Sequence, residues 1–125
     1  MASNKIFRSG PVALTATLTT NILNPNVTSL SGPVGFTMTQ PYIILRHVRI
    51  TNVTSGAVTF TLAIGTTGVT PSSSNAFMGF GTSIPANSYV DWYGMVRLDA
   101  ADFLVGGASA GTSLTFEAEG EIGLV

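Results

Sequence analysis

Apolar and hydroxyl-bearing side chains alternate with a period of two along much of this chain. The clearest run is residues 58–64, where apolar side chains fall on one face and threonines on the other: Val58, Phe60, Leu62 and Ile64 against Thr59 and Thr61. Such alternation is typical of a β-strand that buries only one face. Since no window of a dozen residues has a 3.6-residue period, the sequence predicts an all-β fold.

The same pattern predicts further strands over residues 14–19, 42–52, 103–105 and 112–122, with weaker ones near 34–39, 76–80, 88–93 and 95–98. Turn-forming Gly, Pro, Asn and Ser separate these runs roughly every 8–12 residues. The segment 52–56 predicts a hairpin between 42–52 and 58–64, and the segment 106–111 predicts another between the last two strands. We therefore expect a single antiparallel β-sandwich or jelly roll of about eight strands over residues 11–125.

Residues 1–10 lack this alternation and end at Gly10-Pro11, which predicts a short N-terminal arm. Ile6 and Phe7 are apolar and would gain nothing from exposure to water. We therefore expect the arm to dock on a partner, with Lys5, Ile6, Phe7 and Arg8 as candidate contact residues.

Ionic side chains are unusually scarce. They make up 9% of residues, against about 25% in an average soluble domain. Their distribution is uneven, because residues 1–49 hold four of the five Lys and Arg and no acid, whereas all six acidic residues follow. Few charges suggest either a hydroxyl-coated surface or one covered by partners, and we favour coverage. The opposite charges can pair between neighbouring subunits or within one subunit.

Residues suited to catalysis are also scarce. The chain has no Cys and a single histidine, His47, in the middle of a predicted strand. Disulfides and thiolate metal sites are therefore excluded, and no nucleophile elbow occurs. Asp99 and Asp102 invite a metal site, but we interpret them as turn-forming residues that bond nearby backbone amides. We expect no enzymatic activity, cofactor or metal.

Two groups of residues remain. Glu117, Glu119 and Glu121 share one strand face, which must be solvated or met by cations such as Arg46, Arg49 or Arg97. Trp92 and Tyr93 are candidate partner-binding residues: they suggest a sugar-stacking platform, although a tryptophan more often belongs to a core or an interface. Because the chain is mildly acidic, we do not expect it to bind nucleic acid. Its longest apolar run, residues 42–45, is far too short to span a membrane, so we expect no membrane span. We expect synthesis in the cytoplasm.

The order of several segments resembles a known family. The segments that show the resemblance are residues 45–52, the strand 58–64 with Gly65, Ile84-Pro85-Ala86-Asn87, Tyr93-Gly94, Arg97-Leu98, Ala101-Asp102, Leu104 and residues 108–115. Over residues 42–120, this pattern resembles the small β-sandwich virion proteins of tailed bacteriophages. It is most similar to head decoration (cement) or minor capsid proteins.

The resemblance implies a subunit on the capsid surface of the virion that binds the major capsid protein and stabilises the head. It also implies a homo-oligomer, with a trimer favoured. A tail or baseplate subunit is the first alternative. A carbohydrate-binding module that uses Trp92 and Tyr93 is the second.

Overall fold

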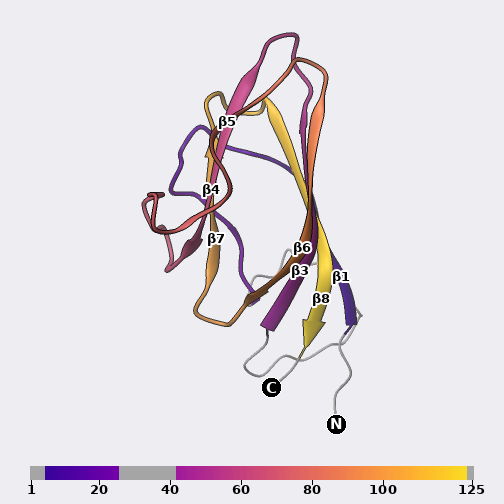
Figure 1. Cartoon of the computed structure of the whole chain (residues 1–125), viewed down its shortest axis with the longest axis vertical. Helices are drawn as coiled ribbons and strands as arrows, with labels where there is room; N and C mark the ends of the chain where they lie inside the picture. Colours follow the sequence, from indigo (N-terminus) through magenta and orange to yellow (C-terminus); the bar gives the residue numbers. More distant parts are fainter. Residues whose placement is uncertain (1–4, 26–41, 124–125) are drawn as a thin grey trace.

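The computed structural model describes residues 5–25 and 42–123, and within them it is built entirely of β-strands and their connections (Figure 1). The strands are β1 (Lys5–Ala13), β2 (Asn21–Leu23), β3 (Tyr42–Asn52), β4 (Val58–Gly65), β5 (Ala76–Ile84), β6 (Tyr89–Leu98), β7 (Phe103–Ala108) and β8 (Leu114–Gly123). They form two four-stranded antiparallel sheets. Sheet A has the order β1-β8-β3-β6, and sheet B the order β2-β7-β4-β5. The predicted all-β sandwich of about eight strands is confirmed.

Both predicted hairpins are wrong. β3 and β4 lie in different sheets, and so do β7 and β8. Among consecutive described strands, only β4 and β5 are paired. Alternation shows which face of a strand is apolar, but in a sandwich both sheets turn apolar faces to the same core. The pattern therefore could not decide whether a connection turns back within one sheet or crosses to the other.

The crossing connection from β3 to β4 is organised by a buried asparagine. The Asn52 side chain donates to the carbonyl oxygens of Gly56 at 2.8 Å and Ile84 at 3.0 Å. Its Oδ1 accepts a hydrogen bond from the backbone N–H of Thr54 at 2.9 Å. One side chain thus closes the connection and ties it to the end of β5 in the opposite sheet.

The N-terminal region also differs from its prediction. Residues 5–10 are not an arm but belong to β1, which pairs with β8 at the edge of sheet A. Phe7 lies in the core, whereas Ile6 faces outward and is 82% exposed. Residues 1–4 and the weak strand predicted near 34–39 lie outside the described residues.

The early strand predicted over residues 14–19 is instead a loop along β7. The backbone N–H of Ala108 donates to the Thr15 carbonyl at 2.8 Å, and that of Gly106 donates to the Thr20 carbonyl at 3.0 Å. A Cβ on Gly107 would lie 2.6 Å from the Thr15 oxygen, so only glycine permits this approach. The alternation was misleading, because Leu14 is buried but Leu18 is exposed.

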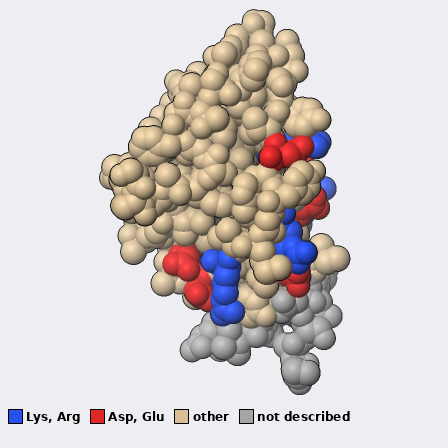
Figure 2. Space-filling model, in the orientation of Figure 1, with Lys and Arg blue, Asp and Glu red and all other residues tan. Residues whose placement is uncertain are grey.

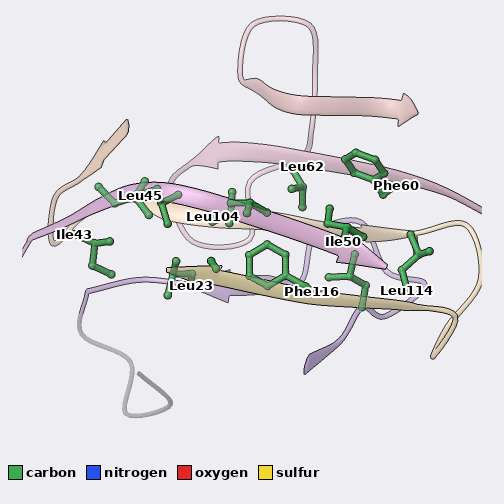
Figure 3. Packing of buried hydrophobic residues seen from close by; sticks show 14 of the residues in the cluster. Leu23, Ile43, Leu45, Ile50, Phe60, Leu62, Leu104, Leu114 and Phe116 are labelled. Carbon is green, nitrogen blue, oxygen red and sulfur yellow. The ribbon is translucent and has the colours of Figure 1, made fainter. Parts of the chain in front are cut away.

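The other weak predictions are extended by the structure. Residues 76–80 form the first part of β5, and the two strands predicted near 88–93 and 95–98 are a single strand, β6, which begins at Tyr89. The inward faces of both sheets form one hydrophobic core (Figure 3). Its largest fully buried side chains are Phe7, Phe60, Phe116, Leu23, Ile43, Leu45, Ile50, Leu62, Ile84, Leu98, Leu104 and Leu114.

Replacing Asn52 with alanine is expected to lower the free energy of unfolding by about 1–3 kcal/mol, because buried backbone groups would lose their partners. Urea denaturation measures this change. Ser55→Ala, at an exposed position of the same connection, is the control and should stay within about 0.5 kcal/mol of the wild type. Equal stabilities for the two variants would contradict the role of Asn52.

Candidate functional site

The charged residues are distributed unevenly over the sandwich. Every Asp, Glu, Lys and Arg lies on a strand of sheet A or in the turn 99–102 that follows β6. The strands of sheet B carry none. In the view of Figure 2, a broad surface free of ionic side chains covers the upper part of the molecule, and the charges gather lower down and along one edge. The structure thus pairs a charged outer face on sheet A with an uncharged half built on sheet B.

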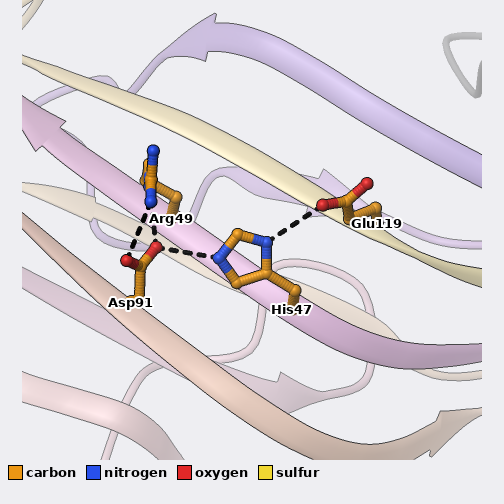
Figure 4. Close-up of polar contacts among 4 residues, drawn as sticks. All are labelled: His47, Arg49, Asp91 and Glu119. Carbon is orange, nitrogen blue, oxygen red and sulfur yellow. Dashed lines mark hydrogen bonds and ion pairs between the residues drawn. The ribbon is translucent and has the colours of Figure 1, made fainter.

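A hydrogen-bonded network centred on His47 occupies the outer face of sheet A (Figure 4). The imidazole Nε2 lies 2.8 Å from Asp91 Oδ1, and Nδ1 lies 3.1 Å from Glu119 Oε1. Arg49 donates through Nε at 2.7 Å and through Nη2 at 3.0 Å to the two oxygens of Asp91. This bidentate geometry is the strong form of an arginine–carboxylate pair.

Strand register brings these residues together. β3 is paired with β6 on one side and β8 on the other, which sets His47 opposite Tyr93 and Glu119, and Arg49 opposite Asp91. A register irregularity between Leu45 and His47 leaves Leu45 in the core and Arg46 exposed. Arg46 consequently reaches Glu121 of β8 at 2.8 Å.

The network shifts the protonation of its members. Burial of the ring disfavours charge on His47, but the hydrogen bonds to Asp91 and Glu119 outweigh this effect and raise the pKa of His47 above 6.5. The hydrogen bond from Arg49, followed by that from His47, lowers the pKa of Asp91 to about 2. The hydrogen bond to Asp91 also raises the pKa of Arg49 above its ordinary value. The two carboxylates therefore favour the protonated form of the imidazole.

Of the arginines expected to pair with Glu117, Glu119 and Glu121, one does so. Glu121 pairs with Arg46, as expected. Glu119 pairs instead with His47, which was not among the cations expected for it. Arg49 binds Asp91 and packs its guanidinium 4.5 Å from the ring centre of Tyr89. Each of these ion pairs joins two neighbouring strands of sheet A.

An open hollow with a volume of about 580 Å³ lies beside the network. We call it the Tyr93 hollow. The side chains that line it are Ile6, Arg46, His47, Tyr93, Glu119 and Glu121. The Tyr93 ring is 70% exposed and stacks on the His47 ring, with 4.5 Å between ring centres and 12° between planes.

The predicted partner-binding residues do not form one site. Ile6 and Tyr93 line the hollow, and Arg8 is exposed on β1, but Phe7 is buried. Lys5 lies in β1. Trp92 packs against the core with its ring 4.9 Å from that of Phe77. Because neighbouring residues of a strand point to opposite faces, Trp92 and Tyr93 cannot form one platform.

Within residues 5–25 and 42–123, no three His, Cys, Asp or Glu side chains are grouped to hold a metal ion. The two nitrogens of His47 each face a different carboxylate. Asp102 Oδ2 accepts from the backbone N–H of Asp99 at 2.9 Å, as predicted for a turn-forming aspartate, whereas Asp99 Oδ1 accepts from Arg97 Nε at 2.7 Å. The described part of the chain also contains no helix able to cross a membrane.

Comparisons with known proteins show a distant structural likeness only. No family model matches the chain, and no curated protein matches it. Among solved structures, Eiger TNF from S. frugiperda aligns over 99% of this chain and 92% of that one, with a TM-score of 0.43 and 10% sequence identity. A likeness this weak carries no functional conclusion.

The network predicts a pH profile for stability. Because the pKa of His47 is raised on folding, its contribution is complete below pH 6.5 and is lost as the pH rises through the folded value. The pKa of Asp91 is lowered, so its contribution is complete above pH 3.8 and is lost as the pH falls towards about 2. Urea unfolding should show a lower free energy of unfolding both as the pH falls towards about 2 and as it rises above 6.5. The His47→Gln variant should abolish the decrease above pH 6.5.

The pKa itself can be read by NMR, since the sole histidine gives one set of imidazole resonances. The wild-type value should exceed 6.5. Asp91→Asn should lower it, because the variant removes one of the two carboxylates that favour the charged ring. A wild-type value at or below 6.5, or no change in the variant, would contradict the network.

Proposed function

We propose that this chain is a structural subunit of a tailed-bacteriophage particle, a head decoration (cement) protein that binds the major capsid protein. The observation that carries the proposal is the half of the molecule without ionic side chains, built on sheet B. A surface meant only for solvent normally carries charges that keep neighbouring molecules apart. The resemblance over residues 42–120 supports the same class of protein.

The uncharged half suits a surface that is covered on assembly. Covering an ionic side chain requires its removal from water, which costs several kcal/mol unless a partner compensates. Hydroxyl groups can be paired by hydrogen bonds at a much lower cost. This half also exposes apolar side chains, including Phe80 of β5, which is 56% exposed. The edge strand β5 has no charged side chain to oppose contact with a partner.

A cement subunit acts through differential binding. It stabilises the assembled shell because it binds the lattice more tightly than it binds separate capsid proteins. Many copies on one shell add their contributions, and an oligomeric subunit gains further from multivalent attachment. We propose a homo-oligomer, with a trimer favoured, on the outside of the virion. No catalytic step is required of the chain.

A tail or baseplate subunit is the alternative within the same particle, since docking through an uncharged face serves either location. Mass spectrometry of separated heads and tails from the source particle distinguishes the two. Detection in heads supports the decoration protein, whereas detection in tails alone favours the alternative. Absence from both would overturn the proposal.

The proposal predicts that the purified chain binds mature capsids and raises their disruption temperature. Phe80→Lys should weaken capsid binding by about tenfold or more, because it places a charge in the covered surface. Met95→Lys is the matched control: Met95 is 68% exposed but lies on β6 of the charged sheet. Sedimentation with capsids and differential scanning calorimetry measure the two effects. Equal binding by both variants would contradict docking through the uncharged half.

A further inference from the structure

We infer that the Tyr93 hollow binds a neutral carbohydrate. This inference is independent of capsid docking, since the hollow lies on the outer face of sheet A and the proposed docking surface is built on sheet B. Its volume of about 580 Å³ falls within the roughly 300–1,000 Å³ common for small-ligand sites. Its openness suits the end or side of a glycan chain rather than an enclosed small molecule.

The aromatic ring provides the first element of recognition. Sugar rings present apolar C–H faces that pack on flat aromatic surfaces. The Tyr93 ring is held in place, because one of its faces stacks on His47 and that imidazole is bonded at both nitrogens. With 70% of Tyr93 exposed, most of the residue remains available to a ligand. A fixed aromatic surface loses little conformational entropy on binding.

Polar side chains around the ring provide the second element. Arg46 and Glu119 keep about half of their side-chain surface exposed, at 50% and 54%. Glu121 lines the same hollow and pairs with Arg46 at 2.8 Å. Guanidinium and carboxylate groups donate and accept in fixed planar geometries, which suits the vicinal hydroxyl groups of a sugar. Ile6, on β1, adds an exposed apolar contact at the rim.

The charge balance of the hollow selects the ligand class. The Arg46 guanidinium pairs with Glu121 and the His47 ring is hydrogen-bonded to Glu119, so each basic group of the hollow already has a carboxylate partner. A phosphate, sulfate or sialic acid would have to compete with these carboxylates for the cations. A cationic ligand would have to compete with Arg46 and His47 for the carboxylates of Glu121 and Glu119. An uncharged polyhydroxylated ligand avoids both conflicts.

A glycan array with neutral and sialylated oligosaccharides, probed with the full chain, tests the inference. Binding to neutral glycans is expected, and isothermal titration calorimetry with the best neutral oligosaccharide then gives its affinity. Tyr93→Ala should weaken that affinity by about tenfold or more. Tyr89→Ala, another exposed tyrosine on β6 that lies outside the hollow, should change it less than about twofold.

Three results would overturn the inference: no glycan bound above background, binding to sialylated glycans alone, or equal effects of the two tyrosine variants. Circular dichroism and urea unfolding confirm that both variants remain folded. Sizing of wild type and Tyr93→Ala by light scattering identifies the competing occupant, a second copy of the chain. A smaller assembly for Tyr93→Ala together with no glycan binding would assign the hollow to that contact.

Discussion

Apolar packing between the inward faces of the two sheets is the interaction on which the rest of the structure depends. Phe116 and Ile50 from sheet A meet Phe60 and Leu62 from sheet B in a single core (Figure 3). Burial of this surface supplies most of the driving force for folding. The outward faces do not contribute to this core, so the side chains on the two outward faces can differ in chemistry. They do differ, since sheet A carries a network of ionic groups and the strands of sheet B carry none.

The network on sheet A depends in turn on the position of β3. A strand with a neighbour on each side can bring groups from both to one side chain, and His47 receives Asp91 from β6 and Glu119 from β8. These bonds fix the imidazole, and the imidazole supports the exposed ring of Tyr93. Core packing thus fixes the strand register, the register brings the ionic groups together, and these groups position the side chains around the hollow. The side chains that line the hollow come together only because β3 lies between β6 and β8.

The contrast between the two sides suits a protein with two kinds of neighbour. A side with paired charges remains compatible with water and offers directional polar groups to a small ligand. A side without charges can be covered by another protein with little loss of ionic hydration. The proposed capsid contact and the proposed glycan site use these two sides separately. A subunit attached through sheet B would leave the Tyr93 hollow facing outward.

Period-two alternation was visible in the sequence, and it determined the fold class and the positions of most strands. Which strands pair was decided only in three dimensions, because apolar faces from either sheet satisfy the same core. For this reason both predicted hairpins became crossings between sheets. The site was hidden for the same reason: the bonds of His47 reach across 44 and 72 residues of chain. Local patterns identify which face of a strand is buried, but only the assembled sheet brings side chains so distant in sequence within hydrogen-bonding distance.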